Sequence, residues 1–142
     1  MGPLGDLTVI DASWGMPGSV ASLLLADSGA TVIKIERPGP GGQPPDLLRL
    51  AWERGKKSVQ LDLRDAADRK VLDGLLNGAD VFIESFGPRR AAPFGLDYDT
   101  LRARFPRLVC CSITGYGHSG PWRDEPGYDC LVAAKLGVMT EQ

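Results

Sequence analysis

The sequence has no excess of charge and no long apolar run, and both absences exclude classes of protein. Its 16 Lys and Arg residues stand against 18 Asp and Glu, so the net charge of −2 gives no general attraction to nucleic acid. The longest apolar run, from Val20 to Ala26 with Ser22 inside it, is far shorter than the roughly 20 residues that span a bilayer. The start of the sequence also lacks the basic segment of a signal peptide, so we expect a cytoplasmic protein with no membrane or nucleic-acid partner.

Cysteine and histidine are scarce, and neither occurs in a metal-binding pattern. Cys110, Cys111 and Cys130 lack the C-x-x-C spacing of zinc and redox sites, and the single histidine is His118. We therefore expect no metal site. The cysteines lie within apolar runs, which predicts buried, reduced thiols. Because no Ser or Cys nucleophile stands in a recognisable setting, we expect His118 to be an exposed loop residue rather than a catalytic base.

The sequence does contain a regular alternation of strand and helix patterns. Hydrophobic residues make up 43% and charged residues 24%, the balance of one folded globular domain. Short β-branched runs bounded by Gly, Pro or Asp predict five strands, at residues 7–11, 31–36, 58–63, 81–84 and 108–113. Helical patterns predict helices at residues 17–28, 66–77 and 97–105, and from about residue 127 to the end through Met139.

Residues at the ends of these segments support the helix assignments. Asp65 is a suitable N-cap for the second helix and Gly78 a suitable C′ residue, while Pro106 stops the third. The first helix is apolar nearly all round, so we expect it to be well buried. The second has apolar residues at helical spacing, which predicts an amphipathic helix on the surface.

The alternation predicts an α/β fold, a Rossmann-like parallel sheet with helices on both faces and right-handed crossovers. In such sheets ligands bind beyond the carboxyl ends of the strands, which places the site after Asp11, Glu36, Glu84 and Ile113. The connection from residue 37 to residue 54 is long and rich in Gly and Pro, so we expect a surface excursion of the kind that often carries binding residues.

The turn after the first strand, residues 12–19, is a candidate anion site. It leads into a helix N-terminus, whose free N–H groups suit a phosphate or carboxylate, although a plain turn without a ligand is an equal alternative. With only Gly15 and Gly18, the turn lacks the G-x-G-x-x-G of dinucleotide-binding proteins. NAD binding is therefore disfavoured, even though Glu36 stands where the ribose-binding acid would be.

Cations and one aromatic residue lie near the other strand ends. Phe86 and the guanidiniums of Arg89 and Arg90 follow the fourth strand, where a base could stack. Five cations that could clamp phosphates, or equally form a solvated charged face, surround the second and third strands: Lys34, Arg37, Arg54, Lys56 and Lys57. The residues alone therefore predict a sheet edge that could bind an anion, and they do not identify a set of catalytic residues.

Seven segments of the sequence, in order, resemble successive motifs of family III CoA-transferases, the group that includes formyl-CoA and carnitine enzymes. They are PLGDLTVID at 3–11, LLADSGATVIKIERPG at 24–39, RGKKSVQLDL at 54–63, ADVFIESF at 79–86, PRLV at 106–109, SITGYGHSGP at 112–121 and PGYD at 126–129. Motifs in the correct order across nearly the whole sequence are far more specific than any one of them.

This resemblance implies that residues 1–142 are the N-terminal, CoA-binding segment of a larger domain, without the small domain and the C-terminal return. It also implies an interlocked homodimer that acts on acyl-CoA and carboxylic acid substrates. Coenzyme A is expected near the first turn and Arg37, and Tyr128 and Asp129 are expected to line the active site. The expected CoA-binding residues are Trp14, Met16, Pro17, Arg37, Lys57, Ser85 and Phe86.

The resemblance further implies covalent catalysis. In this family an aspartate attacks the acyl-CoA thioester, giving an acyl-aspartyl anhydride and then an aspartyl-CoA thioester that a second carboxylic acid resolves. That aspartate is expected in a motif beyond Asp129. We therefore expect no catalytic nucleophile within residues 1–142, and no activity from this segment alone.

Three departures from the family pattern keep other functions open. Residues 16–19 replace the usual turn of a Gln or Leu followed by Ala-Gly-Pro, Ser85 replaces an Asn, and Ala133 replaces a Gln. Each change removes a hydrogen-bonding group, so one alternative is a degenerate, non-catalytic module for CoA binding or dimerisation. A further alternative, an enzyme like α-methylacyl-CoA racemase, is disfavoured because Tyr128 stands where racemases carry His, and a phenol is a poor base near neutral pH.

Overall fold

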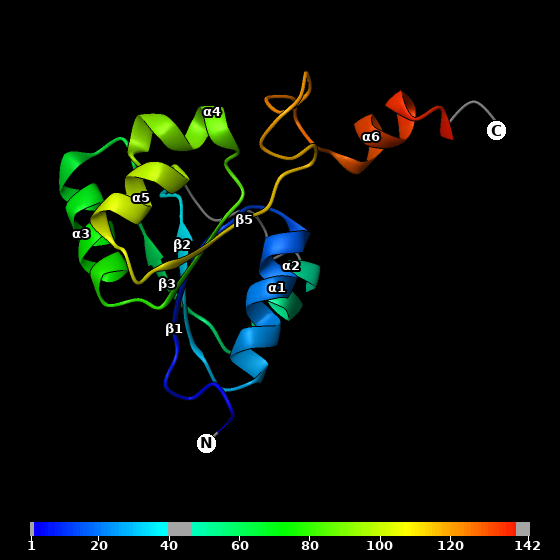
Figure 1. The fold of residues 1–142 in the computed structure, drawn as a ribbon. Coiled ribbons are helices and arrows are strands. Elements are labelled where there is room, and N and C mark those ends of the chain that lie inside the picture. The colour runs from blue at the N-terminus through cyan, green and yellow to red at the C-terminus, as the bar shows by residue number, and fades with distance from the viewer. Residues whose placement is uncertain (1, 40–46, 139–142) are drawn as a thin grey trace.

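The computed structural model describes residues 2–39 and 47–138, and within them five parallel strands form one sheet with helices on both faces (Figure 1). The sheet order is β3-β2-β1-β4-β5, and every neighbouring pair is parallel. The predicted α/β class and parallel sheet are therefore confirmed. The strands are β1 (Thr8–Ala12), β2 (Thr31–Glu36), β3 (Lys57–Gln60), β4 (Val81–Glu84) and β5 (Val109–Ser112). Four of them match their predicted segments to within one residue at each end, whereas β3 ends three residues before the predicted end at residue 63.

Within the described ranges, seven helical segments connect or follow these strands. The main predicted helices are confirmed to within a few residues, and Asp65 caps α3 by accepting hydrogen bonds from the backbone of Ala67 and Asp68. Gly78 is the C-cap of α3, with φ −101°, rather than the C′ residue that we expected. The segments are α1 (Met16–Asp27), α2 (Leu47–Trp52), α3 (Ala66–Asn77), α4 (Pro88–Ala91), η1 (Ala92–Phe94), α5 (Tyr98–Arg104) and α6 (Asp129–Lys135).

Some predictions fall at the edge of the described residues. The expected surface excursion contains α2, which the sequence did not predict, and its residues 40–46 lie outside the described part. The last helix begins at Asp129 rather than near residue 127 and ends at Lys135, while Met139 is also outside the described part. In Figure 1, α6 extends away from the sheet.

The two faces of the sheet carry separate apolar cores. On one face, Ile10 and Phe82 pack with Leu72 and Leu76 of α3 and with Leu101 of α5. On the other face, the core is a smaller cluster around Val9, Val32 and Ile83, with part of α1 packed against it. Figure 1 shows α3 and α5 on one side of the sheet, with α1 and α2 on the other. Because both faces of the sheet are packed, the sheet is a rigid layer, and the ends of its strands have defined positions.

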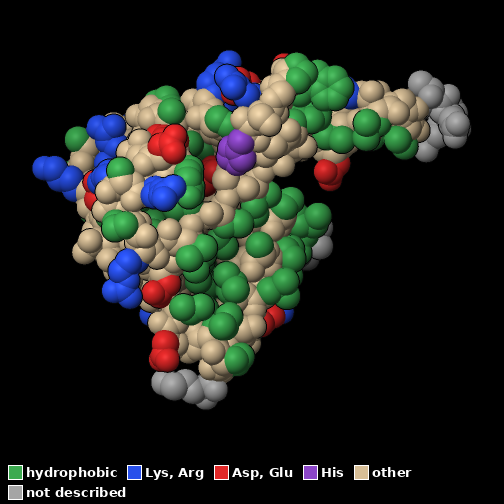
Figure 2. All heavy atoms as spheres, in the orientation of Figure 1, with side chains coloured by type: hydrophobic (Ala, Val, Ile, Leu, Met, Phe, Trp, Pro, Cys, Tyr) green, Lys and Arg blue, Asp and Glu red, His purple; other side chains and the backbone are tan. Residues whose placement is uncertain are grey.

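Two burial predictions are wrong, one for α1 and one for the cysteines. Leu24 of α1 is 62% exposed, so this helix is less buried than its all-round apolar sequence suggested. Cys111 and Cys130 are exposed, and Cys110 is half-buried rather than fully buried. Val109 of β5 is also 61% exposed, and β5 lies at one edge of the sheet that the described residues form, so no described element covers this side of β5. Figure 2 shows apolar side chains gathered over this part of the surface.

None of the helices in the described residues is both long and apolar enough to cross a bilayer. The same residues contain no cluster of three His, Cys, Asp or Glu side chains arranged to hold a metal ion.

Candidate functional site

A cleft of about 860 Å³ opens beyond the carboxyl ends of β1, β4 and β5. The chain runs from β1 outward to β2 and β3, then returns to place β4 on the other side of β1, so the strand order reverses between β1 and β4. In open parallel sheets, ligands bind at such a reversal because the loops on either side diverge and leave a crevice. The cleft therefore lies at the edge of the sheet where the sequence predicts a ligand site, beyond the carboxyl ends of the strands.

The turn after β1 forms the first wall of the cleft, through residues 14–17. Gly15 has φ 83°, a conformation that favours glycine, and it lets the chain enter α1 at Met16. Pro17 stands in the first turn of α1, and no side chain caps this end of the helix. The N-terminus of a 12-residue helix thus faces the cleft with its positive dipole end, a suitable place for an anion.

Trp14 forms a cation–π contact with Arg37. The guanidinium carbon of Arg37, the first residue after β2, lies 3.5 Å from the ring centroid. The Trp14 backbone N–H donates to the Ser85 hydroxyl at 2.6 Å, and that hydroxyl donates back to the Trp14 carbonyl at 3.2 Å. Ser85 therefore joins the first wall to the second. Arg37 stacks on the ring of Trp14, a residue that lines the cleft.

Residues 85–90, after β4, form the second wall. The Phe86 backbone N–H donates to the Glu84 carboxylate, and the Phe86 ring packs against the larger core cluster. The ring is consequently held in place while part of it lines the cleft. Arg89 and Arg90 of α4 add two positive charges to the same wall.

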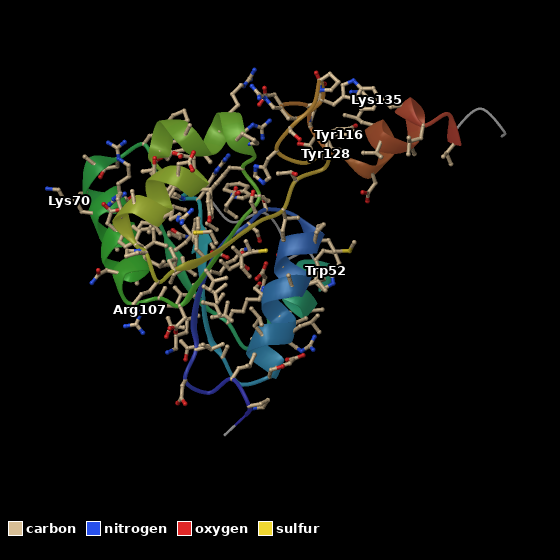
Figure 3. All side chains as sticks on the ribbon, viewed as in Figure 1. Trp52, Lys70, Arg107, Tyr116, Tyr128 and Lys135 are labelled. Carbon is tan, nitrogen blue, oxygen red and sulfur yellow. The ribbon has the colours of Figure 1, made fainter. Side chains whose placement is uncertain are left out.

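The third wall comes from the loop after β5 and from α6. Gly115 and Gly127 touch backbone to backbone, since a Cβ on Gly115 would lie 2.3 Å from the Cα of Gly127. The chain between them is a compact loop with joined ends, of the Ω type. Tyr116 and Trp122 pack edge to face, and the Lys135 ammonium of α6 lies about 5 Å from both rings (5.1 and 4.9 Å). Figure 3 shows Tyr116, Tyr128 and Lys135 gathered where this loop meets α6.

A buried charged cluster lies behind the first wall. The Asp11 carboxylate, fully buried in β1, accepts hydrogen bonds from Lys34, from Ser13 and from Ser22. Lys56 lies 3.5 Å from its other oxygen. Burial by itself raises the pKa of Asp11, but the charge of Lys34 and these hydrogen bonds outweigh it and hold the pKa below its ordinary value of 3.8. Asp11 is therefore an ionised structural group and not a proton carrier.

The cleft brings together most of the predicted site residues. Those that line it are Trp14, Met16, Pro17, Ser85, Phe86, Tyr128 and Asp129. Lys57 is not among the lining residues, because it is the first residue of β3 and so lies toward the amino end of the strand farthest from β5. His118 is exposed in the loop after β5, as expected, and does not line the cleft.

Sequence reasoning missed Arg123 and misread two lysines. Arg123 lines the third wall because the contact between Gly115 and Gly127 folds the intervening loop back, and no strand pattern signals that contact. Lys34 and Lys56 are neither phosphate clamps nor solvated charges, since both ammonium groups are buried against Asp11. The signal that could have indicated this was Asp11 itself, a carboxylate inside an apolar strand.

An α/β domain with a ligand cleft at the reversal of its strand order has the architecture of nucleotide-binding proteins. More specifically, the chain belongs to CoA-transferase family III, whose model matches residues 4–142.

Individual relatives agree with this assignment. The chain is 35% identical over 147 residues to the succinyl-CoA:glutarate CoA-transferase of Homo sapiens, covering 96% of this chain and 34% of that protein. It is 38% identical over 154 residues to a succinate–glutarate CoA-transferase of Agrobacterium fabrum, covering 97% and 38%. The chain thus spans only 34% to 38% of the length of these two relatives.

Solved structures show the same fold. A crystal structure of a Mycobacterium tuberculosis protein matches with a TM-score of 0.86 at 36% identity, covering 99% of this chain and 42% of that one. A CaiB/BaiF family protein from Brucella suis matches with a TM-score of 0.84 at 34% identity, covering 97% and 40%.

Proposed function

We propose that this chain forms the CoA-binding part of a family III CoA-transferase that moves CoA between an acyl-CoA and a carboxylic acid. The observation that carries the proposal is the cleft at the reversal of the strand order, in a chain that belongs to this family. Its volume of about 860 Å³ suits a ligand of cofactor size. Its walls also offer both positive and aromatic groups.

The charged end of CoA would bind at the first two walls. The Arg37 guanidinium on Trp14 and the cations of Arg89 and Arg90 suit phosphate oxygens, which form charge-assisted hydrogen bonds with such donors. The α1 N-terminus adds backbone donors of the same polarity. An adenine ring would stack on the faces that Trp14 and Phe86 offer.

The thioester end would lie toward the third wall. Apolar side chains from Ile113 and Val132 line this part of the cleft and suit the pantetheine arm, and Tyr128 and Asp129 lie beside them. We propose that these two residues line the reaction site without supplying the nucleophile. We also propose, from the family resemblance, a cytoplasmic protein that assembles as an interlocked homodimer.

We further propose that the 142-residue chain does not transfer CoA by itself. Two carboxylates of the third wall are already paired, Asp124 with Arg123 at 3.5 Å and Glu125 with Lys135 at 3.7 Å. Incubation of the purified chain with succinyl-CoA and glutarate, followed by mass spectrometry, should show no new acyl-CoA. Any turnover by the purified chain would refute this proposal, and loss of that turnover in Asp129→Asn would identify Asp129 as the nucleophile.

One observation favours the alternative of a non-catalytic module. The Ser85 hydroxyl is occupied by the Trp14 backbone, and Ala133 offers only a methyl group to the cleft, so two positions of the expected binding pattern supply no free polar group. A module for dimerisation alone would not bind CoA. A racemase-like function has less support, because the single histidine does not line the cleft.

Titration calorimetry with CoA tests the proposed site. Arg37→Ala should weaken CoA binding by about 1–3 kcal/mol, the scale of a charge-assisted hydrogen bond. Arg107→Ala is the matched control, because this exposed arginine lies between α5 and β5, far from Tyr128 and the third wall (Figure 3). Equal affinity in wild type and Arg37→Ala would place the phosphates elsewhere, and no binding by the wild type would favour the dimerisation module.

A further inference from the structure

The buried charged cluster holds both ends of the segment that forms the first wall. The Lys34 ammonium donates to the Ser13 carbonyl at 2.8 Å, immediately before Trp14. The Lys56 ammonium donates to the Ser19 carbonyl at 2.9 Å, two residues after Pro17. The cleft-lining residues 14–17 therefore lie between two backbone carbonyls that are each bound by a buried ammonium group.

A single carboxylate fixes the positions of the two lysines. Lys34 lies 3.1 Å from one oxygen of Asp11, and Lys56 lies 3.5 Å from the other. The exposed fractions of the three side chains are 7%, 1% and 0%, so water does not screen these charges. Since β1 holds Asp11 rigidly in the centre of the sheet, both ammonium groups have one defined place.

Glu53 extends the cluster to the segment that precedes β3. Its carboxylate binds Lys56 at 2.7 Å and accepts a hydrogen bond from the Ser19 hydroxyl at 2.7 Å. The cluster then holds two carboxylates, Asp11 and Glu53, and two ammonium groups. Its charges balance, which is the condition under which buried ions are tolerated.

We infer that Lys34 and Lys56 are positioning residues, which hold the Trp14–Pro17 turn in the conformation that binds the CoA phosphates. Neither lysine lines the cleft, so each acts through the backbone of the turn. No side chain caps α1, and Gly15 is conformationally flexible, so the turn is not rigid by itself. The hydrogen bonds from the two ammonium groups to the Ser13 and Ser19 carbonyls fix its conformation. This inference rests on the proposed function, because it assumes that the turn binds CoA.

The test compares Lys34→Met with Lys70→Met. Lys70 is exposed on α3 and points away from the molecule in Figure 3, so the same change there is the matched control. In a ¹H–¹⁵N spectrum, Lys34→Met should shift the Trp14 indole resonance and the amides of residues 14–19, while α5 and the Trp122 indole stay as in the wild type. CoA affinity should fall at least tenfold. Lys70→Met should change neither.

A second variant covers the case in which Lys34→Met does not fold. Glu53→Gln keeps the shape of a side chain that is 17% exposed and removes one charge, so it should shift the same amides and weaken CoA binding about threefold. The inference is overturned if a folded Lys34→Met or Glu53→Gln binds CoA as the wild type does, or if shifts spread equally over α3 and α5. If the wild type binds no CoA, the proposed function fails, while the spectra still decide whether the lysines order the turn.

Discussion

Replacing Asp11 by Asn removes the charge that two buried ammonium groups share while keeping the shape of the side chain. Lys34 and Lys56 would then have Glu53 as the one remaining carboxylate within the described cluster. Breaking a buried ion pair by removing one partner costs about 3–5 kcal/mol, because the other charge stays buried. With a urea m-value of about 2 kcal/mol per molar, the unfolding midpoint should fall by about 1.5–2.5 M.

Urea titration followed by circular dichroism measures this change, and Asp62→Asn is its matched control. Arg64 lowers the pKa of Asp62 to about 2, a large shift, yet Asp62 and Arg64 meet at the exposed surface, where solvent screens the pair. Asp62→Asn should therefore leave the midpoint unchanged. A midpoint of Asp11→Asn equal to that of the wild type, or an equal loss in both variants, would refute the assignment of Asp11 as the centre of the cluster.

Three further results should follow. The pKa of Asp11 in the folded protein lies below 3.8, so its contribution to stability is present above pH 3.8 and is lost as the pH falls through the folded pKa. In thermal scans below about pH 4, acid should therefore destabilise the wild type more steeply than Asp11→Asn. Gly115→Ala should separate the ends of the loop after β5 and speed its proteolysis, whereas Gly74→Ala in α3, where a Cβ meets nothing within 4 Å, should stabilise the protein by about 0.5–1 kcal/mol. Equal proteolysis of both variants would contradict the close contact between Gly115 and Gly127. Burial and the nearby charge of Glu84 raise the pKa of the Cys110 thiol, whereas Cys111 is exposed. Timed alkylation with iodoacetamide should therefore modify Cys111 before Cys110, and the opposite order in peptide mass spectra would contradict the burial pattern.

The sheet was predictable from the sequence because its strands are short β-branched runs with clear boundaries, as at residues 31–36. The segment 47–52 was missed as a helix, since the Gly- and Pro-rich residues before it dominate the local pattern. The short helices after Gly87 were missed for a similar reason, because Pro88 and Pro93 suggest a loop. Local sequence signals fail where neighbouring residues give opposite indications.

The site was predictable only where strand ends define it. Trp14 and Phe86 follow strands directly, so the strand order alone brings them to one edge. Burial could not be predicted for Lys56, because its partner Asp11 is 45 residues away and no local pattern connects them. The exposure of Cys111 was unpredictable for the opposite reason, since an apolar run indicates burial but does not show whether any described element covers that face.

The pairing of β1 with β4 also bears on how the protein reaches its folded state. These strands are central neighbours, yet the hydrogen bond between Thr8 and Asp80 at their ends joins residues 72 positions apart. The chain must close a long loop before the two meet, and such closure slows folding because its entropic cost precedes the contacts that compensate it. On a ribosome, the first three strands are synthesised before β4, so the crevice between β1 and β4 cannot form until the chain has been extended through β4.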